Sequence, residues 1–506
     1  MPQVSRSEPK ASEDHQVSEL PERRVPPPRR PELAVGVALV VAIAWTYRAV
    51  PDFDFIQFDD TVYVLENPIV RDGLSRAGIA RALTSFHTGN WIPLAWLSHM
   101  LDAELFGVSP GGPHAVNAAL HTANTLLLFG VLRAATGALG PAAFAAAAFA
   151  LHPTRVESVA WISQRKELLA TAFALCATAA WIGWVRRARP AYRAAALGAY
   201  FLALAAKPIA VGLPFLFLLL DVWPLGRTLL AAPAAAPPRA PGGARRLLGE
   251  KLPLFALAAL SCAVTFVAQS SAGAVRDLDR YPPGVRVATA LVAYPTYFAT
   301  AVWPDGLSVY YPHPHGFAAW KVAGGAAFLL AASAGALAAA RRVPAVAVGW
   351  CWFLGWLFPV IGLVQIGGAW RADRYTYFAF VGLFVAAAWG AAALVAHRPR
   401  ARSFVPPLAA AVLVAWTLLS ERQLGYWRDT RTLFEHALAV DPTNAMAHAS
   451  LGSVAEREGR YADALAHYDE AFRLAPDFAN LPEDRARVLR ALDHEVGAEH
   501  ERGPAE

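Results

Sequence analysis

The sequence predicts an all-α membrane protein, a polytopic bundle of about eleven transmembrane helices followed by a short C-terminal helical array. Three observations support this prediction. Hydrophobic residues make up 56% of the 506 residues and charged residues only 17%, which is more apolar surface than a soluble core needs. The apolar residues form blocks long enough to cross a bilayer, separated by short arginine-rich loops. Near the end of the chain, small and large residues alternate at the spacing of a helical repeat.

The chain begins with a polar segment, residues 1–32, that contains many prolines and arginines. Such a segment buries too little apolar surface to fold, so we predict a disordered cytoplasmic tail. An apolar run over residues 33–49 follows directly, without a small-residue cleavage site at its end. We therefore expect an uncleaved anchor that opens a transmembrane domain over residues 33–420.

The positions of the arginines predict the topology of this domain. Arginine-bearing loops such as residues 186–193 and 398–402 lie on the side of the N-terminus if the spans alternate, as the positive-inside rule expects. The net charge of +6 therefore reports topology, and no nucleic-acid partner is expected. The candidate spans are roughly residues 33–49, 116–135, 138–151, 168–185, 193–206, 209–223, 251–269, 317–340, 344–364, 376–396 and 404–420.

Residues 285–302 are apolar enough for a twelfth span. One more crossing would move the arginines at 341–342 and 398–402 to the outside, against the positive-inside rule. Prolines, tyrosines and a tryptophan lie in and around the segment, and Tyr and Trp favour the headgroup region. We therefore predict a broken helix at the outer interface.

The C-terminal segment, residues 421–506, is predicted as an extracytoplasmic helical domain. From Asn444 onward the residues follow the spacing of a tetratricopeptide repeat, in which small residues let paired helices pack closely. Helices near 427–440 and 482–492 are expected as partial repeats or caps. Two roles stay open for so short an array: a docking surface for an acceptor polypeptide, or a cap that stabilises the membrane domain.

Two adjacent acids, Asp59 and Asp60, follow the first span on its outer side. Carboxylates next to a membrane surface carry a desolvation cost unless they are paired or used. We interpret them first as a site and second as a solvated loop. A metal-ligand set of Asp59, Asp60 and His152 is possible in principle, but the spacing does not demand one and no cofactor is firmly implied.

Further polar residues occupy the first outer loop and the start of the second span. A stripe at helical spacing includes Asn117 and Asn124, for which interhelical hydrogen bonding is the favoured interpretation. The histidines of the stripe stay undecided between that role and a site. The candidates for substrate binding or structure here are Asn90, Trp91, His114 and His121.

The second outer loop, residues 152–167, concentrates charges of both signs between two apolar spans. Its arginine could bind a lipid phosphate through a bidentate fork and its lysine as a point charge. Their alternative role is to neutralise neighbouring glutamates, and an isolated outward lysine can simply snorkel. The candidate phosphate contacts are Arg165, Lys166, Lys207 and Arg374, and His152 and Glu157 are candidates for substrate binding or structure.

The three cysteines each lie in an apolar block. Their separation fits neither a metal site nor a disulfide framework. We expect Cys176, Cys262 and Cys351 to be small core residues.

Several stretches carry a resemblance to a known family. They are Phe-Asp-Asp at 58–60, Asn-Trp-Ile-Pro-Leu at 90–94, Leu-Ser-His-Met-Leu-Asp at 97–102, His-Pro-x-x-Val-Glu-Ser-Val-Ala-Trp-Ile-Ser-Gln-Arg-Lys-Glu at 152–167, Lys-Pro at 207–208 and Leu-Leu-Leu-Asp-Val-Trp-Pro-Leu at 218–225. Together with the C-terminal repeat, they resemble the bacterial relatives of the transmembrane and tetratricopeptide repeat-containing O-mannosyltransferases.

This resemblance implies a fold of the C-type glycosyltransferase superfamily in a bacterial inner membrane. It implies inverting transfer of a sugar, mannose in the family, from a polyprenyl-phosphate donor to a protein Ser or Thr hydroxyl on the outer face. Carried onto this chain, it makes Asp59 and Asp60 the candidates for the catalytic base, and Arg165 and Lys166 candidate donor-phosphate contacts. The repeat array is far shorter than in eukaryotic members that modify cadherins, which leaves the acceptor open.

Three alternative functions are weighed against this one. A glycosyltransferase acting on a lipid or polysaccharide would share the same site. A lipid-linked sugar transporter or flippase would place its titratable residues near the membrane midplane, whereas here they crowd the outer loops. A scaffold that anchors the repeat would need one span and no charged second loop.

Overall fold

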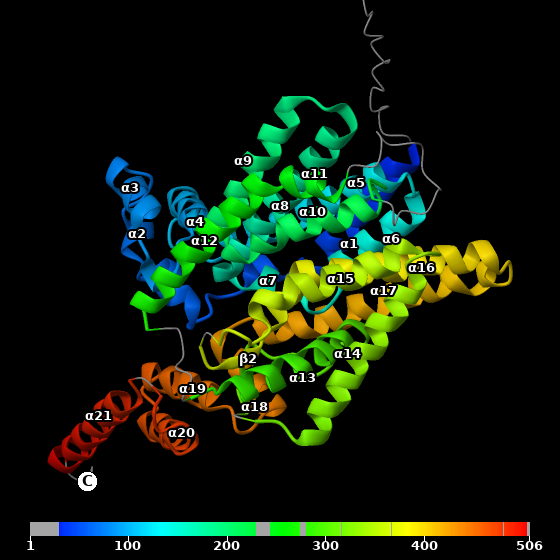
Figure 1. Cartoon of the computed structure of the whole chain (residues 1–506). Helices are drawn as coiled ribbons and strands as arrows, with labels where there is room; N and C mark the ends of the chain where they lie inside the picture. The colour runs from blue at the N-terminus through cyan, green and yellow to red at the C-terminus, as the bar shows by residue number, and fades with distance from the viewer. Residues whose placement is uncertain are drawn as a thin grey trace, which may run out of the picture.

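The computed structural model describes residues 30–228, 243–273, 280–314, 316–365, 367–478 and 480–502. The described chain is almost entirely helical (Figure 1), with one antiparallel pairing of β1 (Tyr311–Pro312) and β2 (Ala369–Arg371). The all-α prediction is confirmed. Most of the predicted cytoplasmic tail, residues 1–29, lies outside the described residues.

The described residues contain eight helices long and apolar enough to cross a membrane, and three shorter apolar helices, so the chain is a multi-pass membrane protein. Each of the eleven predicted spans coincides with a helix, although the number of crossings stays a prediction. The long set includes α13 (Pro283–Val302) and leaves out α9 (Pro190–Ala206). The other helices of these sets are α1 (Arg30–Thr46), α5 (Gly111–Thr136), α6 (Leu139–Leu151), α8 (Arg165–Arg187), α10 (Leu213–Val222), α12 (Leu252–Ser271), α14 (Ala319–Ala339), α15 (Pro344–Leu357), α16 (Thr376–His397) and α17 (Ala401–Leu424).

Helix α13 is continuous, where the sequence predicted a broken element. Pro295 removes the hydrogen bond to the carbonyl of Leu291, four residues earlier. Gly325 of α14 packs directly against that carbonyl, at a distance that leaves no room for a side chain. The helix continues through this position, and α14 packs closely against it there.

The start of α13 contacts the last residues of the predicted span 344–364, and its end contacts the second outer loop. Near its start, an Arg286 guanidinium N–H donates to the Leu363 carbonyl at 3.5 Å. Near its end, His152 Nε2 lies 3.3 Å from the Ala301 carbonyl oxygen. In the middle of α13, the Tyr294 hydroxyl donates to the Leu354 carbonyl at 2.8 Å, mid-way along the same predicted span. The position of α13 at the outer interface therefore stays a prediction.

Two of the cysteines contradict the expectation of core packing. Cys262 on α12 and Cys351 on α15 are exposed, and Cys176 on α8 is half-buried. The surface of a membrane domain faces lipid and is itself apolar, so an apolar block does not distinguish an inward from an outward position.

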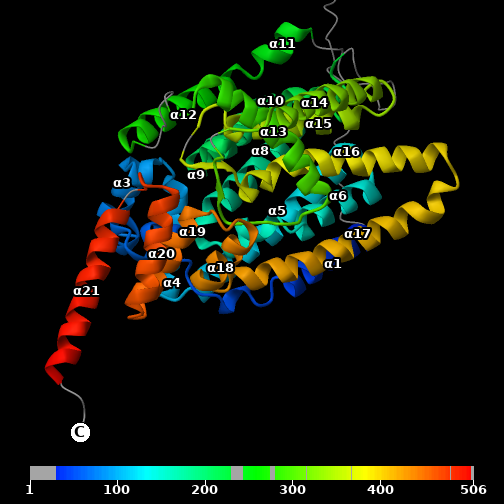
Figure 2. The ribbon, with the colours of Figure 1, turned by 90° about the horizontal axis from the view of Figure 1, so that it is seen from below.

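The outer loops form short elements at the end of the bundle where the C-terminal helices also lie (Figures 1 and 2). The start of α1 and the turn between α16 and α17 lie toward the other end. The short helical elements, most of them in the outer loops, are η1 (Val50–Asp52), η2 (Thr61–Leu65), α2 (Pro68–Arg71), α3 (Arg76–Thr84), η3 (His87–Gly89), α4 (Pro93–Phe106), α7 (Arg155–Ala160), η4 (Ile162–Gln164), η5 (Pro208–Gly212), α11 (Ala244–Gly249), η6 (Phe358–Val360), η7 (Asp373–Tyr375) and η8 (Gly425–Trp427).

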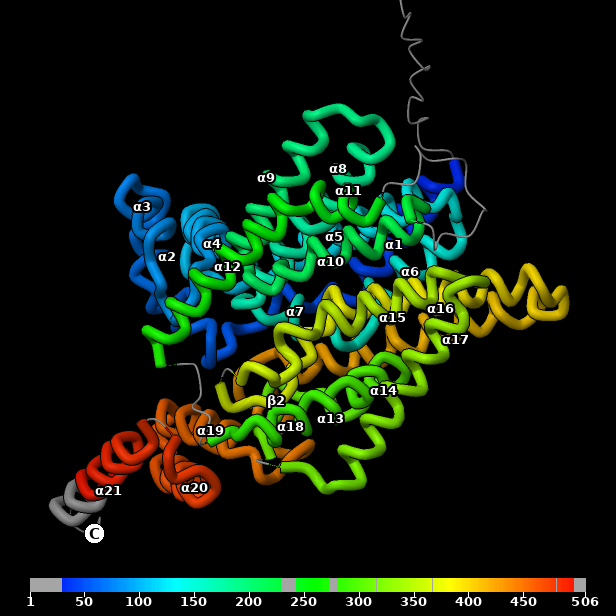
Figure 3. The backbone as a smooth tube through the Cα atoms, in the orientation of Figure 1, coloured from blue at the N-terminus to red at the C-terminus, as the bar shows by residue number. Residues whose placement is uncertain are grey.

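The C-terminal helices are α18 (Thr430–Val440), α19 (Ala445–Arg457), α20 (Tyr461–Leu474) and α21 (Leu481–Arg502), and Figure 3 traces the chain from α17 into them. Gly452 on α19 faces the Tyr468 ring on α20, and an added Cβ would lie 2.6 Å from that ring. This is the small-against-large contact that the repeat spacing predicts. Phe434 of α18 belongs to the same hydrophobic core as the membrane helices, whereas Tyr468 belongs to a separate one.

Candidate functional site

Asp60 is fully enclosed where the first outer loop meets the second. One carboxylate oxygen accepts hydrogen bonds from the Ser163 backbone N–H at 2.9 Å and from the Ser163 hydroxyl. The other accepts from the Ile56 backbone N–H at 3.0 Å. Burial raises the pKa of Asp60 to about 7, against the opposing effect of these hydrogen bonds. Asp60 thus ties the two loops together and has no exposed surface for a substrate.

Asp59 has the opposite environment. Its side chain is 33% exposed, and Oδ2 lies 3.9 Å from Lys166 Nζ. Among the described residues, no donor forms a hydrogen bond with its carboxylate. Lys166 Nζ also lies 3.8 Å from the centroid of the Tyr63 ring, which holds the ammonium beside the acid. The structure therefore brings together the acid of the first loop and the cation of the second.

Arg374 approaches the same place from η7, immediately before α16. Its guanidinium donates to Glu157 Oε1 at 2.5 Å, and its backbone N–H donates to Glu157 Oε2 at 2.7 Å. Its side chain is 21% exposed, and it interacts electrostatically with Asp59. Within the described chain only Glu157 pairs with this guanidinium, so further N–H groups remain for a ligand.

Lys207 completes the group of cations. Its Nζ lies 2.5 Å from Oε2 of the buried Glu167, and it interacts electrostatically with Tyr63 and Glu157. One carboxylate occupies one of the three ammonium donors. We call Asp59, Glu157, Lys166, Glu167, Lys207 and Arg374 the outer cluster, after the side to which the predicted topology assigns it.

Arg165 is the main correction to the predicted site. Its guanidinium is fully buried and donates to Asn117 at 2.5 Å and to Ser98 at 2.7 Å, and at 2.8 Å to both Asp102 and the Pro113 carbonyl. A donor phosphate would have to displace these partners from a site without solvent access. Arg165 therefore acts in this structure as a structural residue that joins α8 to α4 and α5.

The polar stripe of α5 supports the fold. Asn117 donates to the carbonyl oxygens of Val159 and Trp161 at 3.2 and 3.1 Å. Asn124 donates to the Leu168 carbonyl at 2.9 Å, so the expected interhelical bonding of both asparagines is confirmed. His121 is buried, with Nδ1 2.7 Å from the Tyr377 hydroxyl and Nε2 3.0 Å from the Ala150 carbonyl oxygen.

Two other candidate histidines also have structural surroundings. His114 Nε2 lies 3.4 Å from the Asp54 carbonyl oxygen and so supports the loop that carries the acids. His152 is buried against an aromatic group that includes Phe380 and Trp416, with Nδ1 2.9 Å from the Thr154 hydroxyl. The structure does not bring His152 to Asp59, so the ligand set considered from the sequence is not assembled. No group of three or more His, Cys, Asp or Glu side chains suited to a metal occurs among the described residues.

Asn90 and Trp91 lie at the border of the first loop. Asn90 donates to the Thr88 carbonyl at 2.8 Å and accepts from Gln269 at 3.1 Å. Its Nδ2 is 3.4 Å from the Tyr63 hydroxyl, which links it to the ring beneath Lys166. The Trp91 indole N–H donates to the Leu83 carbonyl at 2.9 Å, an internal bond of the loop.

Sequence reasoning did not single out Ser163 and Tyr63. Ser163 holds Asp60, and Tyr63 carries the Lys166 ammonium. Ser163 lies within the charged second-loop motif, two residues before Arg165, but nothing in the motif indicates which neighbour it bonds.

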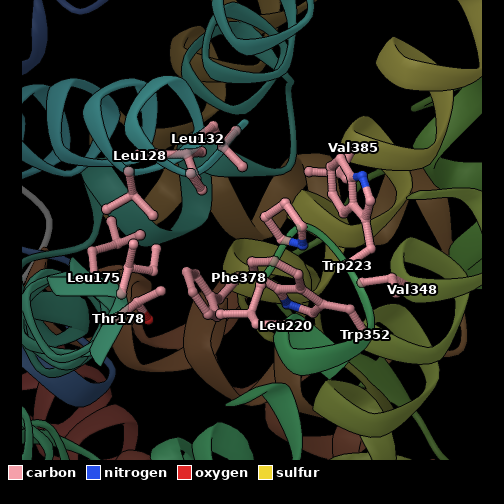
Figure 4. Close-up of a pocket in the computed structure, with 14 residues that line it drawn as sticks. Leu128, Leu132, Leu175, Thr178, Leu220, Trp223, Val348, Trp352, Phe378 and Val385 are labelled. Atoms are coloured by element: carbon pink, nitrogen blue, oxygen red, sulfur yellow. The ribbon is translucent and has the colours of Figure 1, made fainter. Parts of the chain in front are cut away.

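An apolar crevice of about 20 Å³ lies among α5, α8, α10, α15 and α16 (Figure 4). Its lining on α5 begins at Leu128, which is eleven residues, or roughly 16 Å along the helix, beyond Asn117. Thr178 supplies a hydroxyl to a lining that is otherwise apolar apart from the indoles. The crevice lies away from the outer cluster and offers no acid or base.

Comparison with known proteins identifies relatives over part of the chain. Residues 445–478 match the tetratricopeptide repeat family. A segment of 123 residues is 30% identical to protein O-mannosyl-transferase Tmtc2 of Drosophila melanogaster and covers 24% of this chain and 13% of that protein. A protein O-mannosyl-transferase of Caenorhabditis elegans is 34% identical over 134 residues, with coverage of 24% and 19%. Tmtc1 of Drosophila melanogaster is 33% identical over 118 residues, with coverage of 22% and 14%.

Among solved structures, the crystal structure of ArnT from Cupriavidus metallidurans bound to undecaprenyl phosphate aligns with a TM-score of 0.36 and 16% identity. The alignment covers 90% of this chain and 77% of that chain. This likeness is too low to establish a shared fold or ligand. The sequence matches, by contrast, span 13–19% of the curated relatives. The chain is thus a multi-pass membrane protein that carries a tetratricopeptide repeat and that is similar, over about a quarter of its length, to protein O-mannosyl-transferases.

Proposed function

We propose that this protein transfers a sugar, most simply mannose, from a polyprenyl-phosphate donor to a protein Ser or Thr hydroxyl on the outer face of a bacterial inner membrane. The observation that carries the proposal is Asp59, a partly exposed acid 3.9 Å from Lys166 and within electrostatic reach of Arg374. The names of the matched relatives support the reaction class. The donor class rests on the motif resemblance and on the cations.

Asp59 serves as the base in this proposal, and Asp60 positions it. A general base must lie within hydrogen-bond reach of the proton that it removes. Asp60 has no exposed surface and three protein donors, whereas Asp59 has exposed surface and no such donor. The acceptor hydroxyl loses its proton to Asp59 as its oxygen attacks the anomeric carbon of the sugar.

The cations act on the leaving group. The bond between the anomeric carbon and the phosphate oxygen breaks, and its electron pair leaves with the polyprenyl phosphate. Lys166, Lys207 and Arg374 stabilise the growing negative charge, because each retains donors beyond its ion pair with a carboxylate. Attack from the face opposite the phosphate inverts the anomeric configuration in a single displacement, without a covalent intermediate on the enzyme.

The test is sugar transfer by the purified full chain. Labelled polyprenyl-phosphate mannose is incubated with Ser- and Thr-containing polypeptides, and polyprenyl-phosphate glucose serves as the control donor. We expect the wild type to transfer labelled mannose to the polypeptide, and the Asp59→Asn variant to transfer it at least about a hundredfold more slowly. Label that moves only to lipid or polysaccharide would overturn the protein acceptor. A donor that crosses vesicle membranes without releasing its sugar would replace the transferase by a transporter.

A further inference from the structure

The loop that carries the two acids is bonded to the start of the C-terminal domain. The Asp54 backbone N–H donates to the Arg428 carbonyl at 2.9 Å, and the Gln57 backbone N–H donates to the Thr430 hydroxyl at 2.9 Å. Thr430 is the first residue of α18 and is buried. Two backbone amides of residues 54–60 therefore donate to acceptors in the C-terminal domain.

Aromatic side chains also link α18 to the neighbourhood of Asp59 and to Arg374. Phe434 of α18 meets the Phe58 ring edge-on, with centroids 5.9 Å apart. Phe58 immediately precedes Asp59 and stacks on Trp161 at 5.7 Å. The Arg374 guanidinium lies 5.6 Å from the Trp161 ring. A chain of aromatic contacts thus leads from α18 to Phe58, the residue next to Asp59, and on to Arg374.

The position of α18 is fixed independently of this loop. His436 Nε2 lies 2.9 Å from the Leu307 carbonyl oxygen, and Asn444 donates to the Tyr310 carbonyl at 3.1 Å. Phe434 is fully buried in the core shared with the membrane helices. Helix α18 is therefore anchored to the membrane domain, and residues 54–60 pack against it.

We propose that α18 is a positioning element of the active site, in which Thr430 and Phe434 hold residues 54–60 so that Asp59 faces Lys166. This inference rests on the proposed function. It assigns to the C-terminal domain a part in the chemical step, in addition to any docking of an acceptor. A displacement of about 1 Å in a reacting group can cost about a hundredfold in rate, so a small shift of this loop is sufficient to reduce turnover.

The kinetic test compares variants of the full chain at the two contacts. Thr430→Val keeps the shape of the side chain and removes the acceptor of the Gln57 amide, and Thr430→Ser restores that acceptor. We expect Thr430→Val and Phe434→Leu to lower kcat about tenfold while KM for the donor changes less than about twofold. Thr430→Ser should recover most of the rate. Phe472→Ala, in the separate core of the repeat, is the matched control and should leave kcat unchanged.

A second measurement does not depend on activity. Hydrogen exchange at the Gln57 amide should accelerate in Thr430→Val and stay at the wild-type rate in Phe472→Ala. Unchanged exchange together with unchanged kcat in both α18 variants would overturn the proposal, as would a rise confined to KM for the acceptor. If the wild type transfers no sugar, the proposed function fails, and the exchange rates still decide whether α18 holds the loop.

Discussion

Two clusters of acids and bases lie near opposite ends of α8, and they differ in how fully their charges are paired. The inner cluster consists of Asp221, Arg227, Glu250 and Lys251. Asp221 Oδ1 lies 3.0 Å from Arg227, its Oδ2 contacts Lys251, and the Asp221 and Lys251 side chains are at most 1% exposed. In the outer cluster, Asp59 is 33% exposed and 3.9 Å from Lys166.

Helix α8 connects the two clusters. Lys251 Nζ lies 5.1 Å from the Trp181 ring, and Trp181 follows Lys166 by fifteen residues on α8, or roughly 22 Å along the axis. An acid with both oxygens paired by buried cations has no capacity to accept a proton from a substrate. Exposure and unused bonding capacity, rather than the number of charges, therefore distinguish the outer cluster, the proposed catalytic site, from the inner cluster.

A substitution in the outer cluster should affect the rate of sugar transfer, and this is the strongest effect that we predict. Asp59→Asn removes the proposed base, so kcat should fall by about 10²- to 10⁴-fold. Asp59 is partly exposed and accepts no hydrogen bond from described residues. The membrane abundance and the unfolding temperature of the Asp59→Asn variant should therefore match those of the wild type. Rates of sugar transfer, normalised to folded protein, provide the measurement. Full activity of the Asn variant would reject the assignment of Asp59 as base.

A substitution in the inner cluster should instead affect the stability of the fold. Lys251→Met leaves Asp221 as a buried charge that Arg227 alone must balance, and breaking such a pair costs about 3–5 kcal/mol. We expect a lower unfolding temperature in detergent and less protein in the membrane. The double variant Lys251→Met with Asp221→Asn should recover much of this loss. Wild-type stability in the single variant would show that the inner cluster does not support the fold.

A smaller effect concerns the dependence of stability on pH. Burial holds the pKa of Asp60 at about 7 in the folded protein, against about 3.9 in an unfolded chain. The folded state therefore binds this proton more tightly, and the contribution of Asp60 to stability is greatest below about pH 4 and is lost as the pH rises through 7. The change amounts to at most about 4 kcal/mol.

Asp60→Asn supplies the control for this pH effect, since the amide stays neutral throughout. Unfolding temperatures are measured for both proteins between pH 4 and pH 8. We expect the Asn variant to gain stability relative to the wild type as the pH rises. A constant difference across this range would contradict the pKa of Asp60.

The smallest effect tests the cations. Lys166→Gln removes one charge from the outer cluster, and we expect KM for the lipid donor to rise about tenfold. Arg165→Gln is the sequence-adjacent control. It disrupts the buried pair with Asp102, so it should reduce the amount of folded protein rather than raise KM. An unchanged KM in Lys166→Gln would remove this lysine from the donor site.

A large part of the site could be predicted from the sequence. The charge pattern of the loops placed the acids at 59–60 and the cation at 166 on one side of the bundle, and the structure brings Asp59 and Lys166 together. The interhelical role of Asn117 was also predictable, because a polar side chain within an apolar span needs a partner. The structural roles of His121 and His152 could not be predicted, because their partners come from helices distant in the sequence.

The class of protein can be predicted from the sequence, because apolar block length, arginine position and repeat spacing are local properties of the chain. The direction in which each of two adjacent charged side chains points depends on packing between distant segments. Successive residues on a helix point about 100° apart, so Arg165 faces α4 and α5 while Lys166 faces the acid. The support of the acidic loop by α18 was likewise decided by packing between segments that lie 373 residues apart, and no local pattern encodes that contact.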